Sequence, residues 1–178
     1  MSTAISRFKE QPLIGADEKR TEAAGNGCIM RLAPVVIASV AAGNNIQTTM
    51  RLAAMSGRET HFSTLAEKAT ALFAGLLYKA VVTDKKDEIL NFDENKEAVD
   101  TVLLAAIKQA VHGIADQLKP TGFVVDALEV AVWAFMTTDN FKDGALRAVN
   151  MGGDVDTIEA VYGQLAGAFY GLSGIPHK

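Results

Sequence analysis

The chain has 178 residues, of which 49% are hydrophobic and only 4 are proline, so its composition is that of a globular domain and excludes a disordered segment. Its formal net charge of −4 argues against general affinity for nucleic acid or anionic membranes, because both require a basic surface. The single cysteine, Cys28, excludes an intrachain disulfide, and the charged residues between Arg7 and Arg20 exclude a secretory signal. We therefore expect one domain over residues 1–178, located in the cytoplasm, without nucleic-acid or membrane partners.

The first part of the chain alternates between breaks and helical stretches. Residues 1–24 carry mixed charges and are predicted to form a charged leader with a short helix at most. Gly25-Asn26-Gly27 predicts a turn, because glycine and asparagine tolerate positive φ, and the apolar residues 29–42 then predict a helix. A second helix is predicted at 46–56, ended by Ser56-Gly57.

The middle of the chain contains two further helical patterns. Thr64-Leu65-Ala66-Glu67 fits a capping box, and apolar residues recur every three or four positions from Leu65 to Ala80. Residues 83–97 are polar and are predicted to be a loop. A helix is expected from about 98 to 112, with buried positions at Val99, Val102, Leu103, Ala106 and Ala110.

The last third begins at a break at Lys119-Pro120-Thr121-Gly122. Apolar spacing predicts a helix around Val125–Phe135, another over 141–149, and a last one after Asp156. Glycine costs about 1 kcal/mol relative to alanine inside a helix, so the glycines of the last helix predict tight packing against neighbouring helices. Since no stretch alternates apolar and polar residues, the predicted fold class is all-α, with six or seven helices.

Gly152-Gly153-Asp154-Val155-Asp156-Thr157 combines two flexible residues with three oxygen-bearing side chains. One interpretation is a helix cap, in which Asp156 caps the last helix and Glu159 completes a capping-box variant. The other is a metal site, because Asp154 and Asp156 point the same way if the backbone between them is extended. Mg2+ requires six oxygens, so these side chains would supply about half of its ligands.

Two further segments are candidates for ligand binding. The Gly25–Arg31 segment places a glycine turn before a helix, an arrangement that binds phosphate through backbone N–H groups, and Arg31 could add a bidentate contact. A structural turn is the simpler interpretation of this segment taken alone. His61 lies before a helix start, where it either lines a pocket or occupies a structural position.

The order and wording of these motifs resemble the ADP-ribosylglycohydrolase family. The resemblance covers about residues 20–176 and is carried by GNG-x-x-MR-x-AP from Gly25, by Thr60-His61, by Gly152–Thr157, and by the small-residue stretch Gly163–Gly171 with Ile175-Pro176. It implies a compact multi-helix fold, two Mg2+ or Mn2+ ions, and hydrolysis of the bond between ADP-ribose and a protein side chain or small acceptor. The resemblance also implies roles for individual residues, with metal ligands at Asp154, Asp156 and Thr157, and substrate-binding residues at Gly25, Asn26, Gly27, Cys28, Met30, Arg31 and His61.

One departure from the family concerns its second metal-ligand cluster, a threonine followed by two aspartates. Family members carry it in an N-terminal part, whereas this chain contains no Asp-Asp pair. We therefore expect a fold truncated at its N-terminus, with family-like residues over 25–176, an incomplete binuclear metal site and unassigned catalytic carboxylates. The alternatives to an active hydrolase are a non-catalytic ADP-ribose or nucleotide-binding module, and a fragment that needs a complementing N-terminal segment or self-associates.

Overall fold

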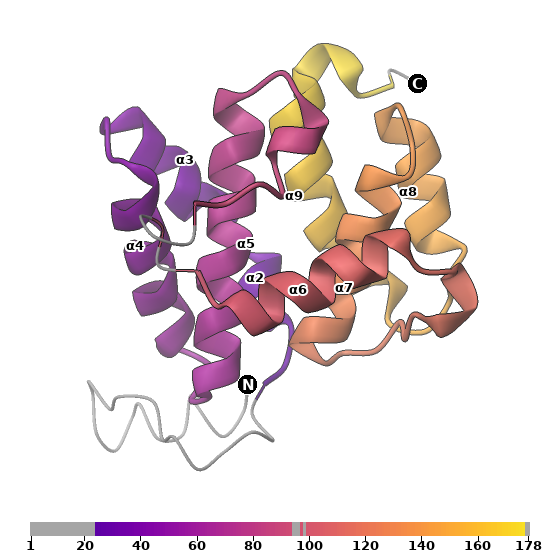
Figure 1. Cartoon of the computed structure of the whole chain (residues 1–178), viewed down its shortest axis with the longest axis horizontal. Coiled ribbons are helices and arrows are strands. Elements are labelled where there is room, and N and C mark those ends of the chain that lie inside the picture. The colour runs from indigo at the N-terminus through magenta and orange to yellow at the C-terminus, as the bar shows by residue number, and fades with distance from the viewer. Residues whose placement is uncertain (1–23, 94–96, 98, 177–178) are drawn as a thin grey trace.

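The computed structural model describes residues 24–93, 97 and 99–176, and within these ranges the chain is helical, which confirms the all-α prediction. The predicted leader over residues 1–24 lies outside the described residues except for Ala24. Helices α5 and α9 lie side by side at the centre, with α3 and α4 against α5, α8 against α9, and α7 between α6 and α9 (Figure 1). The helices are α2 (Gly27–Met30), α3 (Ala33–Ala41), α4 (Ile46–Arg58), α5 (Thr64–Val82), α6 (Thr101–His112), α7 (Val124–Met136), α8 (Phe141–Val149) and α9 (Val155–Gly174).

The apolar stretch predicted as one helix over 29–42 forms two helices, α2 and α3, because of Pro34. Proline lacks an N–H and its ring collides with the carbonyl four residues earlier, which here belongs to Met30. The first helix therefore ends at Met30, and α3 begins at Ala33 with the proline in its first turn, where no N–H is needed. The break turns the chain sharply after the Gly25–Gly27 segment.

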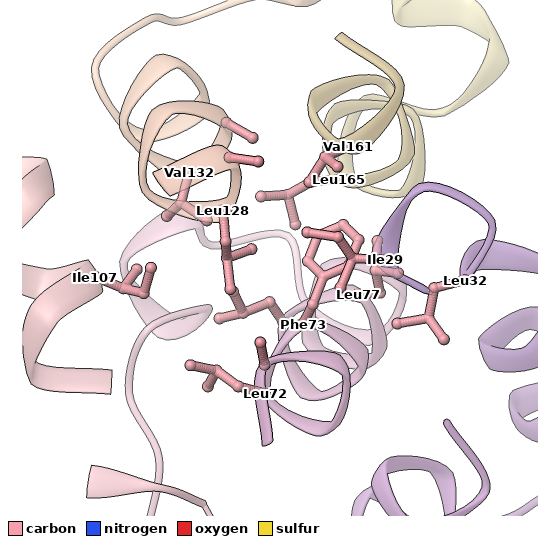
Figure 2. Close-up of a cluster of buried hydrophobic side chains, with 14 of the residues drawn as sticks. Ile29, Leu32, Leu72, Phe73, Leu77, Ile107, Leu128, Val132, Val161 and Leu165 are labelled. Carbon is pink, nitrogen blue, oxygen red and sulfur yellow. The ribbon is translucent and has the colours of Figure 1, made fainter. Parts of the chain in front are cut away.

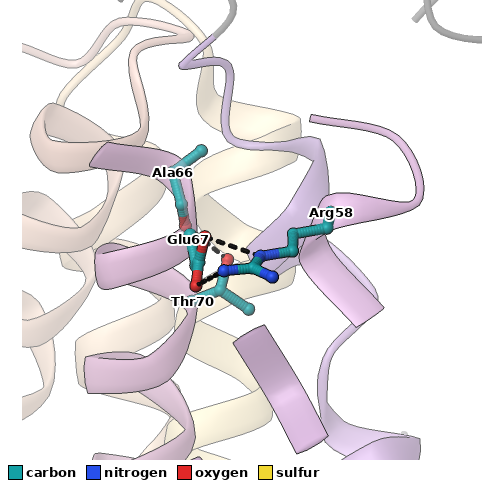
Figure 3. Close-up of polar contacts among 4 residues, drawn as sticks. All are labelled: Arg58, Ala66, Glu67 and Thr70. Carbon is teal, nitrogen blue, oxygen red and sulfur yellow. Dashed lines mark hydrogen bonds and ion pairs between the residues drawn. The ribbon is translucent and has the colours of Figure 1, made fainter. Parts of the chain in front are cut away.

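The connection between α4 and α5 is short and held by polar contacts (Figure 3). The side chain of Arg58 donates to both carboxylate oxygens of Glu67, at 2.7 and 2.6 Å. This pairing corrects the predicted capping box: the N-cap residue of α5 is Ser63, whose hydroxyl accepts from the N–H of Ala66. Glu67 therefore lies one position too far along to complete a capping box and joins the two helices instead.

The core lies where α2, α5, α6, α7 and α9 converge (Figure 2). Its fully buried side chains include Ile29 from α2, Phe73 and Leu77 from α5, Leu128 from α7 and Leu165 from α9. The loop between α5 and α6 also contributes, since the predicted polar segment buries Ile89, Leu90 and Phe92.

Helix α6 corrects one prediction of burial. It begins at Thr101, N-capped by Asp100, and turns Leu103, Leu104 and Ile107 inward. Val102 was predicted to be buried but is 80% exposed, because the inward face of the helix follows the spacing of Leu103 and Ile107.

Three glycines of α9, Gly163, Gly167 and Gly171, were expected to allow close helix packing. A Cβ added to Gly163 or Gly167 would meet no other atom within 4 Å, so no neighbouring helix presses against either position. Gly171 has φ 67° and marks a kink in the helix. The prediction of tight packing at these three positions was therefore wrong. Within the described ranges, none of the helices combines the length and apolar character that crossing a membrane requires.

Candidate functional site

The start of α9 depends on two glycines that adopt left-handed backbone conformations. Gly152 has φ 74° and Gly153 has φ 68°, values that other residues rarely adopt. A Cβ on Gly153 would lie 2.1 Å from the carbonyl oxygen of Pro120, and that same oxygen accepts from the N–H of Asp154 at 3.0 Å. The two glycines thus allow the backbone to pass close to Pro120 and place Asp154 at the N-cap position of α9.

Asp154, Thr157 and Asn26 form a hydrogen-bonded cluster. The side-chain amide of Asn26 donates to Asp154 Oδ2 and to Thr157 Oγ1, both at 2.8 Å. The hydroxyl of Thr157 also contacts Asp154 Oδ2 and lies 2.9 Å from the Asp154 carbonyl oxygen. Two motifs separated by 128 residues therefore meet through side chains, and Asn26 is buried at the junction.

The third predicted metal ligand, Asp156, has different surroundings. It is exposed and lies in the first turn of α9, while Asp154 occupies the N-cap position. The proposal that Asp156 caps the helix was therefore wrong. The argument that Asp154 and Asp156 point the same way was also wrong, because it required extended backbone and α9 begins at Val155.

Backbone hydrogen bonds place Asn26 at this junction. The N–H of Asn26 donates to the carbonyl of Gly122 at 3.0 Å, and the N–H of Val124 donates to the carbonyl of Ala24 at 2.9 Å. These bonds form an isolated antiparallel bridge between Gly25 and Phe123. No sequence pattern indicated this pairing, which attaches the Gly25–Gly27 turn to the segment before α7.

Gln164 is a further residue that the sequence reasoning missed. Its amide donates to the carbonyl oxygens of Ile29 and Met30 at 3.0 Å, and its Oε1 accepts from the N–H of Ala33 at 2.7 Å. The N–H of Ala33 and the carbonyl of Met30 lie at the break between α2 and α3, whereas the carbonyl of Ile29 also accepts from the N–H of Leu32 at 3.4 Å. The sequence signal for this role was that Gln164 is the one amide or charged residue in the stretch 160–171 of α9, which otherwise consists of small, apolar and aromatic residues.

The remaining residues of the Gly25–Arg31 segment face in different directions. Cys28 is buried in the core, and burial raises the pKa of its thiol. Met30 is half-buried and packs against the core. Gly25 and Gly27 flank Asn26, with Gly25 in the bridge and Gly27 as the first residue of α2.

Arg31 and His61 belong to a second polar group next to Gly25. The guanidinium of Arg31 donates to the carbonyl and hydroxyl oxygens of Ser56, at 3.0 and 3.3 Å, and to Thr60 Oγ1 at 2.9 Å. Thr60 Oγ1 lies 2.9 Å from His61 Nδ1. His61 is 8% exposed, and burial together with the positive charge of Arg31 lowers its pKa. The structure thus brings His61 beside the Gly25 turn.

Glu159 lies one turn into α9 and was weighed in the sequence only as a capping residue. Its Oε2 is buried and makes no hydrogen bond within the described part of the chain. Burial raises the pKa of this carboxyl to about 7. Glu159 does not cap the helix, because it lies a full turn beyond the N-cap residue Asp154.

The donor atoms near Asp154 have the chemistry that Mg2+ or Mn2+ prefers. A carboxylate and a hydroxyl converge at Asp154 and Thr157, and hard oxygens are the usual ligands of such ions. Their number is smaller than six, and no group of three or more histidine, cysteine, aspartate or glutamate side chains suited to a metal occurs in the described residues. The donor set fits part of a metal shell.

Comparison with known proteins yields consistent matches. A family model described as ADP-ribosylglycohydrolase matches residues 1–178. The chain is 33% identical over 155 residues to "ADP-ribosylarginine hydrolase Tri1" of Serratia proteamaculans (strain 568), a match covering 87% of this chain and 41% of that protein. It is 28% identical over 153 residues to "ADP-ribosyl-[dinitrogen reductase] glycohydrolase" of Rhodospirillum rubrum, covering 86% and 48%.

A solved structure titled "ADP-ribosylglycohydrolase-related protein complex" superposes with a TM-score of 0.78 at 36% identity, over 97% of this chain and 59% of that one. The matches span less than half the length of the two curated relatives. The fold, the family model and the motifs joined at Asn26 agree, and the chain belongs to the ADP-ribosylglycohydrolase family.

Proposed function

We propose that this chain carries part of a metal-dependent site that hydrolyses the glycosidic bond between ADP-ribose and an acceptor. The observation that carries the proposal is the junction of Asn26 with Asp154 and Thr157, which joins the glycine turn to the oxygen cluster across the length of the chain. Family membership supports the reaction class. Because two curated relatives are named ADP-ribosylarginine hydrolase, an ADP-ribosylated arginine side chain is the first acceptor to test.

The residues divide into two roles under this proposal. The metal ligands are Asp154, Asp156 and Thr157, which hold Mg2+ or Mn2+. The segment Gly25–Arg31 and His61 lie against the ADP-ribosyl group. A bound metal ion would orient ribose hydroxyls and a water molecule for attack on a carbon with oxocarbenium-like character. Asn26 positions the cluster, because its amide donates to Asp154 and Thr157 and so fixes the direction of their oxygens.

We also propose that full activity needs further ligands from a complementing polypeptide. Asp154, Asp156 and Thr157 supply three side chains where Mg2+ takes six oxygens. The matched regions cover less than half of the named curated relatives, so those proteins contain further segments that could supply ligands. A chain without such a complement would bind ADP-ribose weakly and release no product.

The decisive experiment measures ADP-ribose release from ADP-ribosylated arginine at millimolar Mg2+ or Mn2+. The full chain is assayed alone and with the part of the Serratia proteamaculans relative that the match does not cover. We expect release when the added part of the relative is present, and its loss in Asp154→Asn. Asp143→Asn, on the exposed side of α8, is the matched control and should keep the wild-type rate.

Calorimetry with ADP-ribose separates the remaining outcomes. Binding that EDTA weakens, together with turnover, supports the hydrolase. Binding that EDTA leaves unchanged, without turnover in either mixture, would show a non-catalytic ADP-ribose-binding module. Absence of both binding and turnover overturns the proposal. Sedimentation of the chain alone then distinguishes self-association from a requirement for a different polypeptide.

A further inference from the structure

Three polar side chains beside the Gly25 turn form a chain of hydrogen bonds that the proposed reaction does not itself require. Arg31 Nη2 donates to Thr60 Oγ1 at 2.9 Å, and Thr60 Oγ1 lies 2.9 Å from His61 Nδ1. Thr60 is carried by the short α4–α5 connection, where the N–H groups of Thr60 and His61 both point to the carbonyl of Gly57 at 3.3 and 3.0 Å. The geometry of the three groups is therefore set by the backbone.

The direction of each hydrogen bond follows from counting protons. A guanidinium only donates, so Arg31 occupies one lone pair of the Thr60 hydroxyl oxygen. The hydroxyl has one proton, and His61 Nδ1 is the other side-chain atom within hydrogen-bond distance of Oγ1 in the described part of the chain. The arrangement in which the hydroxyl proton also has a side-chain partner directs it at Nδ1, which then accepts it. A neutral imidazole that accepts at Nδ1 carries its own proton at Nε2.

The surroundings keep the imidazole neutral near pH 7. His61 is buried, and burial and the charge of Arg31 both lower its pKa, because each disfavours the protonated ring. A protonated ring would donate at Nδ1 toward a hydroxyl that already accepts from Arg31. The hydrogen-bond chain and the electrostatics therefore select the same form of the ring.

The Nε2 side of the ring faces the glycine turn. A Cβ added to Gly25 would lie 3.5 Å from His61 Nε2, which places this nitrogen directly beside the glycine turn. Gly25 precedes Asn26, whose amide holds Asp154 and Thr157. A donor at Nε2 is thus one residue from the junction at which the proposed function locates the ligand.

We propose that Arg31 and Thr60 are positioning residues that hold His61 in the Nε2–H tautomer, so that this N–H donates to an oxygen of the ADP-ribosyl ligand lying over the Gly25–Gly27 turn. The ligand contact rests on the proposed function, whereas the tautomer does not. Arg31 then acts through Thr60, since its observed partners are Ser56 and Thr60.

The tautomer is tested in the ligand-free chain by long-range 1H–15N NMR of 15N-labelled histidine at pH 8. The chain has 3 histidines, and loss of one signal set in His61→Gln assigns the ring. We expect a protonated Nε2 and an unprotonated Nδ1. Thr60→Val keeps the shape but cannot donate, and should give a mixture of tautomers, while Thr60→Ser should retain the wild-type pattern. An Nδ1–H tautomer in the wild type, or no change in Thr60→Val, overturns the inference.

Calorimetry with ADP-ribose tests the contact. Thr60→Val should weaken binding about tenfold, as expected for one misdirected hydrogen bond, and Thr60→Ser should bind within about twofold of the wild type. Equal affinity of Thr60→Val and wild type overturns the contact. No ADP-ribose binding by the wild type overturns the contact and the ligand assignment together, and the NMR result then stands or falls separately. Circular dichroism confirms that each variant is folded.

Discussion

Helix α9 contains two sets of residues that behave differently in the structure, one that bonds to neighbouring segments and one that faces open space. Thr157 and Gln164, seven positions apart on one face, bond to Asn26 and to the backbone around the α2–α3 break. Gly163 and Gly167 touch nothing at the position of a Cβ, and Gly167 borders an apolar groove of about 210 Å³ between α3, α5 and α9.

The glycines before α9 and those inside it differ in whether the structure requires glycine. At Gly153 the backbone needs a positive φ and a carbonyl lies where a side chain would be, so glycine is required. At Gly163 and Gly167 the backbone is helical and the adjacent space is open, so nothing in the described residues requires glycine. Substitution by alanine should therefore lower the free energy of unfolding at Gly153 and raise it at Gly163 and Gly167.

The largest effect is expected for Gly153→Ala. The new Cβ would lie 2.1 Å from the Pro120 oxygen, and φ 68° strains any side chain, so we expect a loss of about 3 kcal/mol or more in the free energy of unfolding. Urea denaturation measures it. Gly152→Ala is the matched control, because its φ is 74° but no atom lies within 4 Å, and it should cost about 1–2 kcal/mol. Equal losses at both positions would contradict the clash.

Gln164→Met should have the next largest effect. It keeps the volume but leaves the N–H of Ala33 and the carbonyl of Met30 without this partner, and we expect a loss of about 2 kcal/mol. Chemical denaturation is again the measurement. Gln109→Met, on the exposed face of α6, should stay within about 0.5 kcal/mol of wild type. A similar loss for both variants would show that the contacts of Gln164 contribute little.

The junction at Asn26 should give a smaller effect that is coupled to Thr157. Asn26→Ala removes two hydrogen bonds, and we expect a loss of about 1.5 kcal/mol because Asp154 and Thr157 remain bonded to each other. A double-mutant cycle with Thr157→Val isolates the shared term, expected at about 0.5–1 kcal/mol. Strict additivity of the two losses would mean that the Asn26–Thr157 hydrogen bond does not stabilise the junction.

The smallest effect, and the only one of opposite sign, is expected for the open glycines. Gly163→Ala and Gly167→Ala should each raise the free energy of unfolding by about 0.5–1 kcal/mol, through helix propensity and loss of freedom in the unfolded chain. The rise in melting temperature is the measurement. Gly171→Ala, at φ 67° in the same helix, should lower it. Destabilisation by Gly163→Ala and Gly167→Ala would contradict the open space beside these positions.

Local sequence patterns predicted most of the helices, because apolar spacing and turn residues act within a few positions. The helix over 141–149, observed as α8, and the break at Pro120 are examples. The errors arose where two adjacent residues could each fill the same structural position. Ser63, not Thr64, caps α5. On α6, Leu103 lies on the buried face and Val102 is exposed. In both cases the local pattern was correct in kind but shifted by one residue.

The candidate site was predictable only in its parts. The residues of both motifs were identified from the sequence, but their meeting was not, because it depends on the Gly25–Phe123 bridge between segments about 100 residues apart. The extended backbone assumed between Asp154 and Asp156 was wrong, because α9 begins at Val155 and not after Asp156. The assignments of substrate-binding and metal-binding residues remain predictions until ligands are tested.

The long separation between the two halves of the junction has a consequence for folding. Asn26 bonds to residues 128 and 131 positions away, and Gln164 to residues 134 and 135 positions away. Such contacts are slow to form, because the entropy of closing a long loop is lost before any contact is gained. We therefore expect the junction to assemble after the local helix pairs. A ligand bound there would slow unfolding of both ends of the described chain together.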